Sequence, residues 1–119
     1  MTINELSATN VARCAHWHPQ GLEEWSALEW AGAMTGEAGE AANAAKKLKR
    51  LDGGLKSINE AERHYANQQA ASAAVAKEVA DTIIYGLLLM ARVGITDPES
   101  VIREVFNKKS EEYGFVERV

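Results

Sequence analysis

Hydrophobic side chains recur every three or four residues through most of the chain, which is the spacing of amphipathic helices. The clearest example lies on a helix expected over residues 71–93. Its predicted core-facing stripe is formed by Val75, Val79, Ile83, Leu87 and Met90. No segment alternates apolar and polar residues for long enough to predict a strand. The pattern therefore predicts an all-α protein.

Capping and breaking signals place the helices of the first half. Thr2 and Glu5 have the spacing of a capping box, so we expect a helix to start at Thr2 and to end before Pro19. A second helix is expected over residues 22–51, and the pair Gly53-Gly54 would stop it.

A polar stretch separates the second helix from the helix of residues 71–93. Within it, Ser57 and Glu60 again have capping-box spacing. This spacing predicts a short additional helix over residues 58–70.

The last helix has signals at its start and just before it. Gly94 stands where a C-cap glycine would end the preceding helix. Asp97-Pro98 offers an N-cap residue followed by proline at the first helical position, and this helix would run to about Tyr113. With no internal repeat and no shift in composition, we expect residues 1–119 to form one domain, a bundle of four to five helices.

Composition supports helices and favours self-association. The 119 residues include 20 alanines, the strongest helix former, and only 2 prolines. Alanine-rich helices bury little apolar area each, so a lone bundle of this size would be thinly stabilised. We therefore expect a homodimer or a homotetramer.

Charge and hydropathy exclude several kinds of partner. The net charge of −4 is unlike that of a nucleic-acid module, which binds largely by neutralising phosphates. The longest apolar stretch, residues 83–91, is much shorter than the about 20 residues that span a bilayer. The beginning of the chain does not resemble a signal peptide, and a single cysteine, Cys14, fits a reducing compartment. We expect a cytoplasmic protein that binds neither nucleic acid nor membrane.

Two pairs of carboxylates are the candidate chemistry. Glu37 and Glu40 lie three residues apart in the second helix, and Glu78 and Asp81 have the same spacing in the third. Residues three apart share a helix face, so antiparallel packing of the two helices would bring four carboxylates together. Such a group favours Mg²⁺ or Mn²⁺ over zinc or a di-iron centre, because no histidine has a matching position.

Acidic pairs at this spacing are also common on solvated helix faces, and three features argue for a functional site. Glu78 and Asp81 directly precede the most apolar stretch of their helix. Tyr85 follows Asp81 by four residues, on the same face. Gly36 and Gly39 flank the first pair, and a helical glycine costs about 1 kcal/mol relative to alanine, which close approach of another helix would explain.

The segments Gly36–Asn43 and Glu78–Tyr85 together resemble the paired motif of MazG-like nucleoside triphosphate pyrophosphohydrolases, an all-α superfamily. The stretch Phe106–Phe115 is similar to the end of the last helix in phage and bacterial members. Two departures are Gly36, where many members carry a further Glu, and a longer segment between the motifs.

The resemblance implies a magnesium-dependent hydrolysis of a nucleoside or deoxynucleoside triphosphate to the monophosphate and pyrophosphate. It maps the metal ligands onto Glu37, Glu40, Glu78 and Asp81. Glu37 or Glu40 would also orient the attacking water as general base, and the sequence does not choose between them.

Basic and aromatic residues are the candidate substrate contacts. Lys47 is the cation of the second helix nearest to the first acidic pair, and Asn107 and Lys108 belong to the family-like tail. Solvated lysines near a helix C-terminus are the ordinary alternative. For the base, the candidates are Trp17, His18, Trp30 and Tyr85. The tryptophans could equally be core or subunit-interface anchors.

Two other functions compete with this interpretation. A dUTPase or a phosphoribosyl-ATP pyrophosphatase on the same fold would differ only in substrate. A non-enzymatic helical oligomerisation module would leave the carboxylates as a solvated face.

Overall fold

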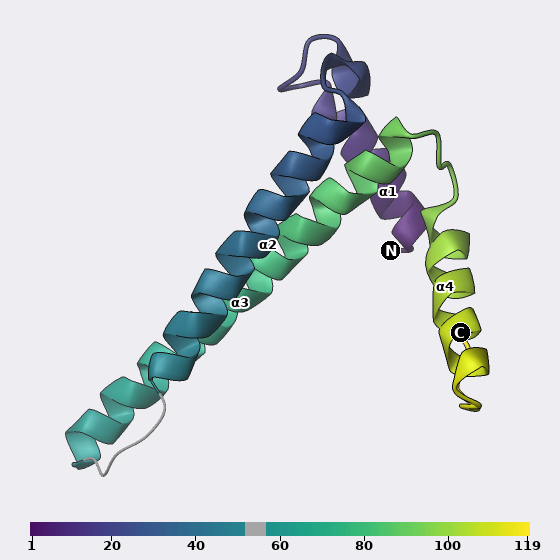
Figure 1. Cartoon of the computed structure of the whole chain (residues 1–119). Coiled ribbons are helices and arrows are strands. Elements are labelled where there is room, and N and C mark those ends of the chain that lie inside the picture. The colour runs from purple at the N-terminus through teal and green to yellow at the C-terminus, as the bar shows by residue number, and fades with distance from the viewer. Residues whose placement is uncertain (52–56) are drawn as a thin grey trace. The chain divides into compact units, whose positions relative to one another are not determined.

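The computed structural model describes residues 1–51 and 57–119, apart from the side chain of Glu62, and these residues are helical with no strand. The elements are α1 (Ile3–Cys14), a short 3₁₀ helix (Gly21–Glu24), α2 (Ala27–Arg50), α3 (Ile58–Arg92) and α4 (Pro98–Glu112), as Figure 1 shows. The all-α prediction is confirmed. Over the described residues, no helix is both long and apolar enough to cross a membrane.

Both predicted capping boxes form. The Thr2 hydroxyl accepts a hydrogen bond from the Glu5 N–H at 3.0 Å, and the Glu5 carboxylate accepts one from the Thr2 N–H at 2.7 Å. Ser57 and Glu60 exchange the same two hydrogen bonds, at 3.3 and 2.9 Å. Each pair satisfies backbone donors that the first turn of a helix leaves without a partner.

The helix that begins after Ser57 is not short, and this part of the prediction is wrong. Residues 58–70 and 71–93 belong to one helix, α3, which runs for 35 residues from Ile58 to Arg92. The physical reason is the sequence around the predicted break, which holds alanine and glutamine and neither glycine nor proline. Nothing in this sequence stops a helix once it has started.

The start of α2 also differs from the prediction. The helix begins at Ala27 rather than Leu22, because the extended backbone of Trp25 interrupts the helical path. Before it, Gly21 has a positive φ of 64°. Between these two residues the chain makes one 3₁₀ turn. The end of α2 at Arg50 agrees with the prediction, whereas Gly53-Gly54 lies outside the described residues.

The predicted junction between α3 and α4 is confirmed. Gly94 has a φ of 90°, and the Ile95 N–H donates to the Met90 carbonyl at 3.0 Å, as in a glycine C-cap. The Asp97 carboxylate then accepts from the Ser100 N–H at 3.1 Å and caps α4, whose first residue is Pro98.

The chain divides into two compact units by its internal contacts. One unit comprises Met1–Leu28 with Leu87–Val119, and the other is Glu29–Gly86. The single domain over residues 1–119 stays a prediction.

The first of these units contains α1 and α4. Asn4 links them, since its side-chain amide donates to Asp97 at 2.8 Å and its carbonyl oxygen accepts from the Glu99 N–H at 3.1 Å. Cys14 is buried, and burial, followed by the nearby charge of Glu24, raises the pKa of its thiol.

The unit Glu29–Gly86 is a helical hairpin in which α2 and α3 run antiparallel side by side (Figure 1). Within it, the fully buried large side chain is Trp30, whose ring centroid lies 6.2 Å from that of Tyr85. Val79 and Ile83 are 45% and 50% exposed, so the predicted core-facing stripe is wrong at these two positions. Glu78 faces α2, and Val79 lies about 100° further round the helix.

Gly36 and Gly39 were expected to allow the close approach of another helix, and within one chain no such neighbour is found at either residue. Apart from its two chain neighbours and the nearby backbone of α2, no described atom lies within 4 Å of the position that a Cβ would occupy at either residue. A close neighbour is found instead at Gly86 of α3, where a Cβ would lie 3.4 Å from the Met34 sulfur. Within the hairpin, a side chain of α2 therefore contacts α3 at a glycine that the sequence did not single out.

Candidate metal centre

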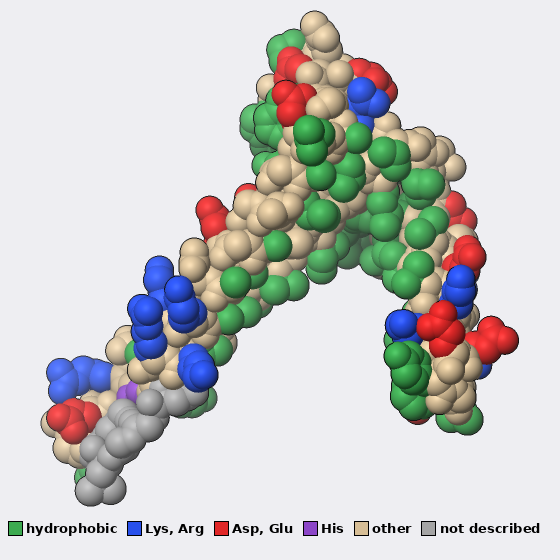
Figure 2. Space-filling view, viewed as in Figure 1, with side chains coloured by type: hydrophobic (Ala, Val, Ile, Leu, Met, Phe, Trp, Pro, Cys, Tyr) green, Lys and Arg blue, Asp and Glu red, His purple; other side chains and the backbone are tan. Residues whose placement is uncertain are grey.

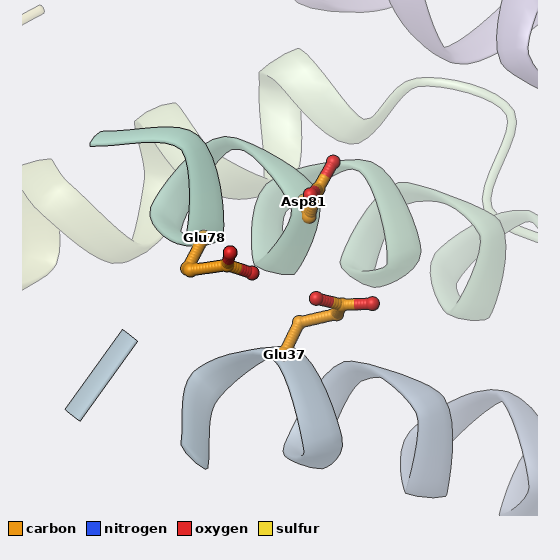
Figure 3. Close-up of side chains that lie close together, drawn as sticks. All are labelled: Glu37, Glu78 and Asp81. Carbon is orange, nitrogen blue, oxygen red and sulfur yellow. The ribbon is translucent and has the colours of Figure 1, made fainter. Parts of the chain in front are cut away.

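Three acidic side chains meet between the two helices of the hairpin. Glu37 projects from α2 towards Glu78 of α3, and Asp81 lies next to Glu78 on the same helix (Figure 3). One carboxylate oxygen from each residue lies within 4.8 Å of the other two. All three residues are half-buried, so their charges are partly removed from water.

The local helix geometry explains this arrangement. Glu78 and Asp81 lie three residues apart in an unbroken helix and therefore share one face. Small side chains lie where the two helices meet, since Ala44 is buried and lines one groove together with Ala71 and Ala74 of α3.

Glu40 is not a member of this group. It is exposed, and it lines a groove beside the group together with Glu78. It shares a helix face with Glu37, and its charge acts on Glu37, but it does not belong to the group whose oxygens lie within 4.8 Å of one another. Of the four carboxylates expected to converge, the structure gathers Glu37, Glu78 and Asp81.

The electrostatics of the group favour uptake of positive charge. Burial raises the pKa of Glu37, and the nearby carboxylates of Glu40, Asp81 and Glu78 raise it further. Glu78 Oε2 is buried and accepts no hydrogen bond from the described residues. A carboxylate oxygen in this state needs a proton or a cation.

Lys77 supplies part of the positive charge that the three carboxylates require. Its ammonium donates to Asp81 Oδ2 at 2.8 Å and to Glu78 Oε1 at 3.2 Å. These two hydrogen bonds raise the pKa of Lys77. The side chain is nevertheless largely exposed, which keeps such ion pairs weak and exchangeable.

The donor set fits a hard divalent cation. Three carboxylates on two helices supply oxygen ligands alone, which suits Mg²⁺ or Mn²⁺ better than zinc. One oxygen of Glu78 is still without a hydrogen-bond donor from the described residues, even with Lys77 in place. These residues could therefore hold a metal ion.

The hairpin also contains three of the predicted substrate contacts. Lys47 is exposed and lines the groove that Glu40 and Glu78 share. Trp30 is only 1% exposed, which favours the alternative that it anchors the core. Tyr85 is half-buried against it.

The remaining predicted contacts belong to the other unit. Trp17 is 66% exposed, and the Arg13 guanidinium lies 5.4 Å from its ring centroid. His18 pairs with the Glu24 carboxylate, and its ring lies edge-on against that of Trp25. The Asn107 side chain exchanges two hydrogen bonds with the Val119 backbone, and Lys108 is exposed.

Two residues near the carboxylates were missed from the sequence. Lys77 precedes Asp81 by four residues, a spacing that pairs opposite charges on a helix and could have revealed the contact. Asn43 follows Glu40 by three residues and lines the same groove, so the helix period could have placed it too.

Comparisons of the chain with models of protein families, with curated proteins and with solved structures find no match. The resemblance to MazG-like enzymes thus rests on the motif residues named above. A function for this chain is argued from those residues and from the geometry of the three carboxylates.

Proposed function

We propose that this protein is a magnesium-dependent hydrolase that converts a nucleoside or deoxynucleoside triphosphate to the monophosphate and pyrophosphate. The observation that carries the proposal is the meeting of Glu37, Glu78 and Asp81 from two antiparallel helices, with oxygens within 4.8 Å of one another. The motif resemblance supplies the type of reaction.

The roles of the acids follow from their positions. Glu37, Glu78 and Asp81 hold the metal, for which Mn²⁺ would substitute. When bound, Mg²⁺ offsets the charge of the phosphates and lowers the pKa of the attacking water. Glu40 is exposed and outside the group of three, so we assign it as the general base that accepts the proton of the water.

The charge balance explains why the acids and a metal are needed together. The chain has a net charge of −4, and its substrate would also be strongly anionic. A divalent cation held by the carboxylates removes this repulsion at the place where substrate must bind. Lys77, which occupies part of the same space, moves aside when a cation is bound.

A panel of nucleotides tests the proposal. With Mg²⁺ present, we expect the wild-type protein to release pyrophosphate from at least one nucleoside triphosphate, and a chelator to abolish the release. In heavy-oxygen water the label is expected in the monophosphate, because water attacks the phosphorus nearest the sugar. dUTP and phosphoribosyl-ATP belong to the panel, since either could be the preferred substrate.

Glu40→Gln should be inactive or nearly so, and Glu104→Gln is its control. Glu104 is exposed on α4, and the same substitution there should leave the rate within about twofold. A wild-type protein inert towards every nucleotide would end the proposal, as would equal activity of Glu40→Gln and Glu104→Gln.

We further propose that the chain assembles as a homodimer or a homotetramer. In the described part of the hairpin, the buried apolar side chains are Trp30 and Ala44, whereas Val79 and Ile83 remain about half exposed. Two helices with so small a core gain stability when a second copy covers the open apolar side chains. The same observation favours the oligomerisation module as the second candidate function.

Light scattering tests the assembly. We expect the wild-type protein to be larger than a monomer at micromolar concentration and Ile83→Lys to shift the population towards monomer. Ser72→Lys serves as the control, because Ser72 is an exposed polar residue of the same helix. A monomeric wild type, or an equal response of both variants, would contradict the proposed interface.

A further inference from the structure

Lys77 places its ammonium group against the three carboxylates of the hairpin. The Nζ atom donates to Asp81 Oδ2 at 2.8 Å and to Glu78 Oε1 at 3.2 Å. Both acceptors belong to residues of the group whose oxygens lie within 4.8 Å of one another. Lys77 is therefore bonded to two of the three residues that would hold the metal.

The lysine reaches the acids from the solvent side. Its side chain is 67% exposed, whereas those of Glu78 and Asp81 are 16% and 33% exposed. All three residues belong to α3, and Lys77 precedes Asp81 by four residues, so the contact needs no other helix. Because the four-carbon stem of lysine is flexible, the ammonium can leave by rotation of its own side chain, without any shift of α2 or α3.

The charge of Lys77 offsets the acids only in part. Three carboxylates in one group carry more negative charge than a single ammonium neutralises. Glu78 Oε2 shows this imbalance, since it is buried and accepts no hydrogen bond from the described residues, even though Lys77 bonds the other oxygen of the same carboxylate. Lys77 therefore stabilises the metal-free group but leaves it able to attract a stronger cation.

A divalent cation and this ammonium compete for the same carboxylates. Mg²⁺ or Mn²⁺ has twice the charge of the ammonium and can take one oxygen from each of the three residues. Two cations on the same carboxylates repel each other, and the ammonium is the one carried by a flexible, exposed side chain. Metal binding therefore includes the loss of two hydrogen bonds of Lys77, which lowers the metal affinity below that of the three carboxylates alone.

We propose that Lys77 is a resident competitor of the metal ion, which holds the metal-free group together and sets the divalent-cation concentration at which the site fills; the inference rests on the metal site of the proposed function. Below that concentration, Lys77 keeps Glu78 and Asp81 paired with positive charge. Above it, the ammonium moves into solvent and releases their oxygens. The protein thus exchanges one counter-ion for another and does not keep three half-buried carboxylates without positive charge.

Lys77→Met tests the inference through two measurements that do not involve hydrolysis. Methionine removes the ammonium and keeps most of the side-chain length and the helix propensity. Calorimetry should show Mn²⁺ binding that is about threefold to tenfold tighter, because no ion pair has to break. In buffer with a chelator, the midpoint of thermal unfolding should instead fall by about 2–5 °C. A lysine that helped to hold the metal would give the opposite change in Mn²⁺ affinity.

Lys46→Met is the matched control, since it makes the same charge change at another exposed lysine of the hairpin. Lys46 lies near the end of α2, where Lys and Arg side chains gather (Figure 2). At about 0.15 M salt the long-range effect of a surface charge is largely screened. The Mn²⁺ affinity of Lys46→Met should therefore stay within about twofold of the wild type.

The outcomes separate this inference from the proposed function. Unchanged or weaker Mn²⁺ binding in Lys77→Met, equal changes in Lys46→Met and Lys77→Met, or no binding by either the wild type or Lys77→Met would overturn the role of Lys77, even if the protein hydrolyses nucleotides. Selective tightening in Lys77→Met supports it, including in a protein that hydrolyses none of the nucleotides tested. Far-UV circular dichroism of each variant confirms that the helices are intact.

Discussion

Glu78→Gln is expected to lower the kcat/KM of pyrophosphate release by at least about 100-fold, the loss typical when one group that stabilises transition-state charge is removed. Glu78 contributes to the three-carboxylate group and also lines the adjoining groove. Glutamine preserves the shape of the side chain but removes its negative charge. The effect should therefore come from weaker metal binding rather than from altered packing.

The measurement is a set of initial rates over a range of Mg²⁺ concentrations, with Mn²⁺ binding followed separately by calorimetry. Both the rate and the Mn²⁺ affinity should fall in Glu78→Gln. They should remain near wild-type values in Glu104→Gln, which changes an exposed acid on α4. Full activity of Glu78→Gln at an ordinary Mg²⁺ concentration would show that this carboxylate does not hold the metal.

Trp30→Ala is expected to lower the free energy of unfolding by about 3–5 kcal/mol. The side chain is 1% exposed and is the largest fully buried one among the described residues of the hairpin. Removing it leaves a cavity beside Tyr85 that two alanine-rich helices cannot fill without moving. Urea denaturation followed by circular dichroism measures the change.

Trp17→Ala is the control for Trp30→Ala, because it removes the same indole ring from an exposed position. Trp17 is 66% exposed, so its removal should cost less than about 1 kcal/mol. Both variants must be compared at one protein concentration, because assembly would add to the apparent stability. Similar costs for the two substitutions would mean that Trp30 is not part of the core.

The ends of most helices could be predicted because they depend on chemistry within a few residues. The hydroxyl and carboxylate of Thr2 and Glu5, or of Ser57 and Glu60, reach only the backbone of their own first turn. Gly94 ends α3 through its own positive φ. Such signals can be recognised without knowing what packs against the helix.

The errors arose where distant contacts or the absence of a stop signal decide the outcome. The break expected near residue 70 had no glycine or proline to cause it, so α3 continues. The exposure of Val79 and Ile83 depends on which face of α3 meets α2. A repeating apolar stripe shows that a face is apolar and does not show what covers it.

The candidate metal centre was predictable in outline, because the spacing of Glu78 and Asp81 fixes a shared face and antiparallel packing brings α2 opposite. The position of Glu40 outside the group was not, since it depends on how far each carboxylate of α2 lies from α3, which the spacing along one helix does not determine. The contact of Lys77 with Asp81 has the i, i+4 spacing of oppositely charged pairs on a helix, so it was open to prediction as well.

The glycines of α2 have a consequence for how firmly the site is held. Gly32, Gly36 and Gly39 each have open space where a methyl group would be, and each lowers helix propensity by about 1 kcal/mol relative to alanine. Glu37 therefore sits on a stretch of α2 whose backbone unwinds at lower cost than an alanine sequence would, which favours transient local opening and amide exchange with solvent. A ligand bound to its carboxylate would also hold these turns of the helix closed.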